Sequence, residues 1–298
     1  MGAIPLRRIK EIIGREYHMN EERQLVNGGR RFEFGKNWQR FLSRLNEDRI
    51  LEAEKSLRQM LEVDDLRGRS FLDIGSGSGL FSLAARRLRA RVYSFDYDPL
   101  SVACTMELRQ RYFANDANWI IEQGNVLDRG YLKSLGQFDI VYSWGVLHHT
   151  GAMWRALENV IPLVAQEGRL AISIYNDQGK TSLRWGALKK FYNQSSRPVR
   201  MSIVLTVGAF RFFSLAFNRL IKFQNPLPFT EWAEGKKDRG MSVWYDLVDW
   251  VGGYPFEVAK PEAIFDFYRE QGLYLVKLKT SWGGCNEFVF TKEDKRKT

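Results

Sequence analysis

Short apolar runs alternate along the chain with segments whose apolar residues recur at helical spacing. The apolar runs predict buried strands, because parallel strands in an α/β sheet are covered on both faces. Alternation of strands with helices predicts an α/β fold with a doubly wound, mostly parallel sheet. The predicted strands lie at 71–74, 91–96, 119–124, 138–143 and 170–175, and a closing hairpin lies at 273–280 and 286–290.

The segments before and inside this pattern divide the chain further. A polar arm at 4–17 and a Gly28-Gly29 break precede the amphipathic pattern 38–61, which predicts a helix or a helix pair. After the fifth strand, the next helical pattern is delayed to 261–272. We therefore expect four parts: an N-terminal helical leader (1–67), a ligand-binding core (68–175), a helical lid insertion (176–260) and a C-terminal helix with the closing hairpin (261–298).

The first strand runs into Asp73-Ile-Gly-Ser-Gly-Ser-Gly79, a turn that leads to a helix. Glycine allows a sharp turn and lets a ligand lie against the backbone. The spacing is not the G-x-G-x-x-G of dinucleotide sites, and no Gly-Lys-Ser/Thr follows, so the turn favours a nucleoside-like ligand without phosphates. Asp96, at the tip of the second strand, is placed to accept both hydroxyls of a ribose.

Four motifs in order resemble those of the class I S-adenosylmethionine-dependent methyltransferases. They are Asp73–Gly79, Asp96 with Asp98-Pro99, Gly124–Asp128, and Phe138 to His149. The resemblance covers about 68–175. Within the family, the chain is similar to the O-methyltransferases of ubiquinone biosynthesis and related small-molecule enzymes. It implies a seven-stranded Rossmann-like fold, S-adenosylmethionine as cofactor and S-adenosylhomocysteine as product. The implied cofactor-binding residues are Asp73, Gly75, Ser76, Gly77, Gly79, Asp96, Tyr97, Asn125, Val126, Leu127, Asp128, Ser143 and Trp144.

The resemblance places the end of the fourth strand near the reacting methyl group. Ser143-Trp-Gly stands there in place of the Asn/Asp-Pro-Pro-aromatic motif of nucleic-acid N-methylating enzymes, which disfavours that substrate class. His148 and His149 follow, and histidine suits a general base for a hydroxyl acceptor. Asp246 is a further candidate base, and helix capping or packing is the alternative for each. Two roles are likewise left for Asp128: a contact with the adenine, or the N-cap of the following helix.

We expect methyl transfer to a hydroxyl of a small molecule, such as a quinone precursor, lipid, sugar or natural product. An RNA methyltransferase and a non-catalytic adenosyl-binding protein are the alternatives. The substrate-binding candidates are Tyr175, Tyr245, Asp249, Trp250, Tyr254 and Asn286.

Composition says little about the fold, but its uneven charge says more about the insertion. The two cysteines cannot form a disulfide framework, no metal-ligand spacing occurs, and a cytoplasmic location is expected. Of the net charge of +10, a surplus of eight lies at 177–240, with twelve Lys/Arg against four Asp/Glu. No run of eighteen uninterrupted apolar residues occurs, so no transmembrane helix is expected.

The insertion combines an apolar stretch at 202–217 with basic flanks, and three interpretations remain open. It can lie on a membrane surface and admit a lipid-like acceptor. Its basic and aromatic residues can hold RNA. Or it is a lid whose apolar face packs on the core or in a homodimer while its charges are solvated.

Overall fold

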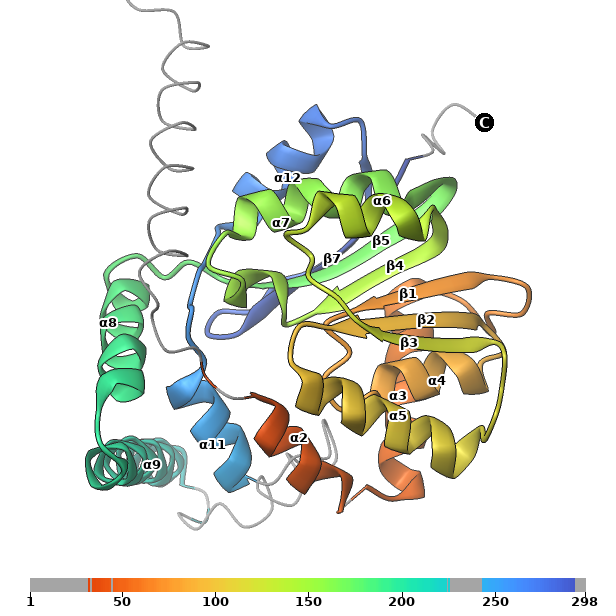
Figure 1. Ribbon diagram of the computed structural model, residues 1–298. Coiled ribbons are helices and arrows are strands. Elements are labelled where there is room, and N and C mark those ends of the chain that lie inside the picture. Colours follow the sequence, from red (N-terminus) through yellow and green to blue (C-terminus); the bar gives the residue numbers. More distant parts are fainter. Residues whose placement is uncertain (1–31, 33, 44, 224, 226–242, 293–298) are drawn as a thin grey trace, which may run out of the picture.

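A computed structural model describes residues 32, 34–43, 45–223, 225 and 243–292. These residues form a sheet of seven strands in the order β3-β2-β1-β4-β5-β7-β6, in which only β7 runs antiparallel to its neighbours. The predicted doubly wound α/β fold with a seven-stranded, mostly parallel sheet is confirmed (Figure 1). The strands are β1 (Ser70–Ile74), β2 (Arg91–Asp96), β3 (Trp119–Gln123), β4 (Phe138–Trp144), β5 (Val164–Tyr175), β6 (Tyr274–Lys279) and β7 (Cys285–Thr291).

Helices cover both faces of the sheet, as continuously apolar strands require. Figure 1 shows α6 (Arg129–Leu135), α7 (Met153–Val160) and α12 (Pro261–Glu270) above the sheet. Below it lie α3 (Glu47–Leu61), α4 (Leu80–Arg87) and α5 (Pro99–Tyr112). Each layer of helices closes its own apolar cluster with one face of the sheet. The short 3₁₀ helices η1 (Leu147–His149) and η2 (Ile161–Leu163) flank α7.

The described part of the leader is a helix pair. A first helix, α2 (Phe34–Leu42), is separated from α3 by Asn46, whose side chain accepts a hydrogen bond from the backbone N–H of Arg49 at 3.2 Å. This N-cap starts a new helix within the single amphipathic pattern seen in the sequence. The predicted arm 4–17 and the Gly28-Gly29 break lie outside the described residues.

The insertion contributes α8 (Lys180–Gln194), α9 (Arg197–Ile221) and α11 (Val243–Gly252). Together with α2 they lie beside the end of the sheet from which β5 leads into α8 (Figure 1). This is the edge where ligands bind in open α/β sheets. The insertion therefore lies beside the edge of the sheet at which a ligand is predicted.

Helix α9 bears on two expectations, and the absence of a transmembrane helix stays a prediction. By length and composition α9 is apolar enough to cross a membrane, with a mean hydropathy of 1.5 over its most apolar window. The sequence has no uninterrupted apolar run of that length. Arg211 and small polar residues break the run without lowering the average much. The alternative that its apolar face packs on the core is wrong for the part of the chain described, because only 6% of that window is buried.

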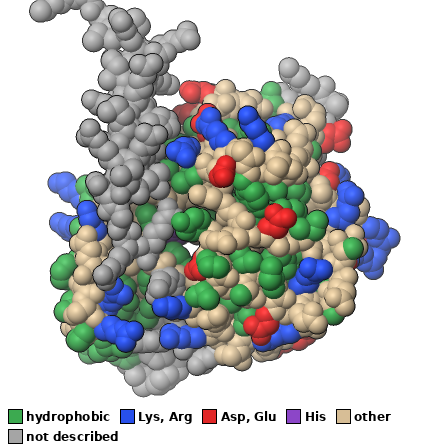
Figure 2. All heavy atoms as spheres, in the orientation of Figure 1, with side chains coloured by type: hydrophobic (Ala, Val, Ile, Leu, Met, Phe, Trp, Pro, Cys, Tyr) green, Lys and Arg blue, Asp and Glu red, His purple; other side chains and the backbone are tan. Residues whose placement is uncertain are grey.

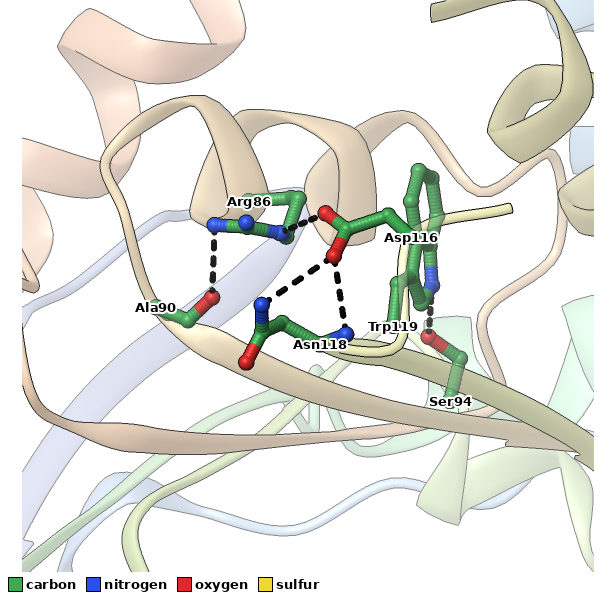
Figure 3. A network of polar contacts seen from close by, with 6 residues as sticks. All are labelled: Arg86, Ala90, Ser94, Asp116, Asn118 and Trp119. Carbon is green, nitrogen blue, oxygen red and sulfur yellow. Dashed lines mark hydrogen bonds and ion pairs between the residues drawn. The ribbon is translucent and has the colours of Figure 1, made fainter. Parts of the chain in front are cut away.

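A polar network links the last turn of α4, away from the glycine turn, to the segment before β3 and to β2. Arg86 Nε lies 2.5 Å from Asp116 Oδ2, and Arg86 also donates to the carbonyl of Ala90 (Figure 3). Trp119 Nε1 donates to Ser94 Oγ at 3.0 Å. Ser94 continues to Ser82 at 2.8 Å, and so the network leads to the carboxylate of Asp73.

Candidate active site

The glycine turn between β1 and α4 has the backbone geometry that only glycine adopts readily. Gly75, Gly77 and Gly79 have φ of +75°, +56° and +81°. A Cβ added at Gly75 would lie 2.4 Å from Cγ1 of Val146, and one at Gly79 would lie 2.8 Å from the backbone of Thr105. Both the conformation and the space therefore exclude a side chain at the position where the resemblance places the cofactor.

Asp96 lies directly beside this turn. Its Oδ2 accepts from the N–H of Gly77 and its Oδ1 from the N–H of Asp98, both at 2.9 Å. The backbone N–H of Tyr97 also donates to this carboxylate, which has about four acceptor positions in all. Burial raises the pKa of Asp96 to about 6, against the effect of these hydrogen bonds. The arrangement fits a carboxylate that accepts from two ribose hydroxyls.

Asp73 is buried beneath the turn rather than open to solvent. Its Oδ2 accepts from Ser82 Oγ at 2.5 Å. Burial raises the pKa of Asp73 to about 7, and the neighbouring charge of Asp96 adds to the increase. Ser76, also in the turn, shares a hydrogen bond of 3.0 Å with Thr105 of α5. The predicted role of Asp73 toward an amino group stays a prediction.

The loop after β3 carries the residues predicted to contact the adenine. Gly124 N–H donates to the carbonyl of Asp96 at 3.0 Å, which brings this loop next to the ribose candidate. Asn125 Oδ1 accepts from the N–H of Leu127, and Val126 and Leu127 are buried. Asp128 caps α6, because its Oδ1 accepts from the N–H groups of Gly130 and Tyr131. Oδ1 of Asp128 therefore serves as the N-cap of α6. A contact between Oδ2 and the adenine stays a prediction.

Other predicted cofactor residues surround the same place. Ser143 at the end of β4 donates to the carbonyl of Ile74 at 3.1 Å and ties β4 to the turn. Trp144 is half-buried against the apolar cluster below the sheet, and Tyr97 is largely exposed next to Asp96. Trp38 of α2 was missed, although a Cβ at Gly77 would lie 3.0 Å from its indole nitrogen. No sequence signal marks Trp38, because its position depends on how the leader folds over the turn.

His149 lies one 3₁₀ turn after Val146, the residue that packs on Gly75. Its Nδ1 is 2.5 Å from the carbonyl oxygen of Pro255. A carbonyl only accepts, so Nδ1 carries the proton of the neutral ring and Nε2 keeps its lone pair. Burial lowers the pKa of His149 to about 4, which keeps the ring neutral at physiological pH.

His148 is placed differently. It is fully buried, with its ring centroid 4.2 Å from that of Tyr175 and 4.5 Å from that of His149. Burial holds its pKa well below the usual range. Of the two histidines, His149 alone keeps solvent exposure, so it is the better candidate for contact with an acceptor.

The acceptor candidates on β5 and α11 form an aromatic row next to His149. Tyr175 lies 5.5 Å from His149 and 6.2 Å from Trp250 between ring centroids, and Trp250 lies 4.8 Å from Trp185 of α8. Trp185 was missed, because an isolated tryptophan in a basic helix gives no sign of what it packs against. The row connects the end of β5 with the lid.

A cavity of about 480 Å³ lies between α8, α9 and α11 at the outer end of this row. Its wall includes Trp185, Val207, Phe210, Arg211 and Trp250. The volume suits a small organic molecule. The predicted acceptor residue Trp250 therefore separates the cavity from Tyr175 and the histidines.

The remaining predicted acceptor residues have structural partners. Asp249 accepts a hydrogen bond from Asn37 of α2, and the carbonyl of Tyr254 accepts from the N–H of Phe32 at 3.1 Å. Asn286 is buried and bonded to Ser281 and Asn176, which holds the β6–β7 turn against the end of β5. Tyr245 and Asp246 lie on α11, and their side chains fall outside the described residues.

A buried cation beneath the lid was also missed. Lys189 Nζ donates to the carbonyl of Trp250 and lies 4.6 Å from the Trp250 ring centroid and 4.9 Å from that of Phe256. Burial lowers the pKa of Lys189 to about 7, and the charge of Asp249 opposes this shift. In the sequence Lys189 looks like any other member of a basic segment.

Comparison with known proteins agrees with this geometry. A family model described as a methyltransferase domain matches residues 72–170. Magnesium protoporphyrin IX methyltransferase from Synechocystis PCC 6803, solved with bound SAH, has a TM-score of 0.51 and 14% identity over 87% of this chain and 94% of its own. No curated protein sequence matches the chain significantly.

Two further solved structures are similar in fold. An O-methyltransferase family protein from Burkholderia thailandensis has a TM-score of 0.50 and 12% identity over 83% of this chain. PKMT2 from Rickettsia typhi, in complex with AdoHcy, has a TM-score of 0.51 and 12% identity over 82%. The chain spans 57% and 53% of the length of these two proteins. Residues 72–170, with the strand order around them, are thus a methyltransferase domain of the class I fold.

Proposed function

We propose that the chain transfers the methyl group of S-adenosylmethionine to a hydroxyl of a small-molecule acceptor, with His149 next to the reacting oxygen. The cofactor supplies a methyl group that its sulfonium already activates. The protein therefore has to align the two reactants and exclude water. The remaining chemical task is to receive the proton that the acceptor hydroxyl loses.

The residues of the turn fit this cofactor. Gly75, Gly77 and Gly79 give the turn a positive-φ backbone without side chains, and Asp96 lies beside it as an acceptor for ribose hydroxyls. The neighbour from Synechocystis was solved with SAH bound, which supports the same ligand here. Val146 joins the turn to η1, so an acceptor beside His149 would also lie near the methyl group.

The observation that carries the choice of a hydroxyl is the contact between His149 and Pro255. Because Nδ1 donates to that carbonyl at 2.5 Å, Nε2 is free to accept the hydroxyl proton as the oxygen bonds to the methyl carbon. The carbon–sulfur bond breaks at the same time, and its electrons stay on the sulfur. Tyr175 and Trp250 offer ring faces for an aromatic or lipid-like acceptor.

Two measurements test this proposal. Isothermal titration should show binding of S-adenosylmethionine and S-adenosylhomocysteine, and a panel of phenols and alcohols should reveal turnover. His149→Ala should lower kcat by roughly 10²–10⁴-fold and leave cofactor affinity unchanged. Added imidazole should restore part of the rate in His149→Gly.

Each failure has its own meaning. No cofactor binding would overturn the methyltransferase proposal itself. Binding without turnover on any acceptor would favour the adenosyl-binding alternative. Turnover within a few-fold of wild type in His149→Ala would remove the histidine from the reaction while keeping the rest.

A further inference from the structure

Helix α9 presents a long apolar face to solvent, which we call the α9 outer face. Phe210, Phe213 and Phe217 are 73%, 67% and 64% exposed. An exposed apolar surface of this extent marks an interaction site. The α9 outer face consists of Met201, Leu205, Phe210, Phe213, Phe217, Leu220 and Ile221, all exposed.

The opposite face of α9 is anchored to the domain. Val204 is buried in a cluster with Tyr192, Leu247 and Val251, and a Cβ at Gly208 would lie 2.9 Å from Leu247. Residues 203–208 of α9 therefore pack against α8 and α11, and Figure 1 shows α9 end-on, crossing the directions of these two helices. This geometry suits a helix lying in the plane of an interface better than one that crosses a bilayer.

The charge around the α9 outer face has one sign. Residues 178–223 contain nine of the 45 Lys/Arg and none of the 35 Asp/Glu, so nine of the ten net positive charges lie in this segment. Lys189 is buried, and the other eight flank or interrupt the apolar residues. Figure 2 shows hydrophobic and basic side chains together at the edge of the molecule over α8 and α9.

We propose that the α9 outer face and the basic residues of α8 and α9 dock the protein on an anionic lipid bilayer. Phe and Leu side chains enter the headgroup boundary, and Lys and Arg stay level with the phosphates. A second copy of the chain fits less well, because a twofold contact would bring two all-basic segments together. RNA would pair with the charges but leave the apolar face uncovered.

The docked orientation also gives the acceptor a route, a step that rests on the proposed function. Phe210 belongs to the α9 outer face and also lines the cavity, whose inner wall is Trp250. A lipid-soluble acceptor can thus pass from the bilayer into the cavity without crossing water, as far as the Trp250 ring that separates the cavity from Tyr175 and His149, with Arg211 at the same wall for a polar head. We therefore assign a membrane-dissolved amphiphile with a free hydroxyl as the acceptor class.

Vesicle flotation of the full chain, without cofactor or acceptor, tests the docking directly. The protein should float with vesicles of equal parts phosphatidylcholine and phosphatidylglycerol, and float poorly with phosphatidylcholine alone. Phe213→Ser/Phe217→Ser should weaken binding by at least about tenfold with an unchanged melting temperature. Lys190→Gln/Lys222→Gln should weaken binding to the anionic vesicles about fivefold for each charge removed. High salt should also weaken this binding.

Matched controls lie on remote helices of the core. Met106→Ser on α5 removes an exposed apolar side chain, and Lys133→Gln on α6 removes an exposed cation; neither should change flotation. Absence of binding to the anionic vesicles, or equal binding by the Phe213/Phe217 variant, would overturn the proposal. So would a dimer in light scattering that the same variant dissolves, or resistance to alkaline carbonate extraction, which indicates a spanning helix.

Because flotation needs no methyl transfer, its result is independent of the proposed function. Anionic vesicles should in addition raise turnover of a lipid-soluble acceptor and leave that of a water-soluble analogue unchanged. Equal turnover of both with and without vesicles would remove the acceptor route and leave the docking in place.

Discussion

The hydroxyl of Ser82 donates to the buried carboxylate of Asp73 at 2.5 Å, directly beneath the glycine turn. Burial raises the pKa of Asp73 from 3.8 to about 7, so the folded state holds its proton at pH values where the unfolded chain has lost it. Stability therefore falls as pH rises from about 4 to about 7 and stays lower above that range.

We expect Asp73→Asn to stabilise the protein at pH 8 by about 2 kcal/mol, because the neutral amide avoids the buried charge and still accepts from Ser82. The gain should vanish near pH 4. Thermal unfolding at the two pH values measures it. Asp139→Asn is the control of opposite sign. Burial raises the pKa of Asp139, but hydrogen bonds from Ser70 and the charge of Arg69 outweigh it and lower the pKa, so this variant should destabilise the protein at pH 8.

Loss of the Asp96 carboxylate should weaken cofactor binding without unfolding the chain. Asp96→Ala is expected to cost about 2–3 kcal/mol of binding free energy, or roughly 30–150-fold in Kd. Isothermal titration measures this. Asp116→Ala, which breaks the ion pair with Arg86 away from the turn, should lower the melting temperature and leave Kd unchanged.

The affinity for the cofactor should depend on pH through the same carboxylate. The pKa of Asp96 is raised to about 6, and only its ionised form accepts from two hydroxyls. Affinity should therefore fall as pH drops through about 6, and this dependence should be absent in Asp96→Asn. A flat profile in the unchanged protein would contradict the ribose contact.

A side chain at Gly75 should disrupt the turn more than one at Gly145. Both glycines have positive φ, +75° and +74°, but a Cβ at Gly145 would meet no atom within 4 Å, whereas one at Gly75 would meet Val146. Gly145→Ala should destabilise by about 1 kcal/mol, and Gly75→Ala by a further 1–3 kcal/mol. Urea unfolding compares them. If Val146→Ala fails to relieve Gly75→Ala, the clash is not the cause.

Because the amine of Lys189 is buried, the stability of the protein should rise with pH in the alkaline range. Burial lowers its pKa from 10.5 to about 7, so the unfolded chain binds the extra proton between these values and stability rises with pH across them. Lys189→Met should be more stable than the unchanged protein near pH 7, and the difference should shrink toward pH 10. The exposed neighbour gives the control, since Lys190→Met should leave the slope of melting temperature against pH unchanged.

The sequence by itself determined the parts that depend on local backbone sterics and on periodicity. The apolar runs defined the strands, because a strand covered on both faces has few other patterns. The turn was marked by Gly75, Gly77 and Gly79, whose positive φ angles are unfavourable for residues with a side chain. Asp96 lies at the end of the next strand. The delay before 261–272 corresponds to the helices α8, α9 and α11 between β5 and α12, and the boundaries of the four parts stay a prediction.

The tertiary structure decided what depends on contacts between distant residues. Trp38 reaches Gly77, and Pro255 sets the tautomer of His149, through approaches of the leader and of the segment after α11 that no local pattern encodes. Lys189 and Lys190 are adjacent in a basic helix, yet one is buried against Trp250 and the other exposed. The apolar stretch at 202–217 has the composition of a core helix, and its exposure follows from the domain covering only one of its faces.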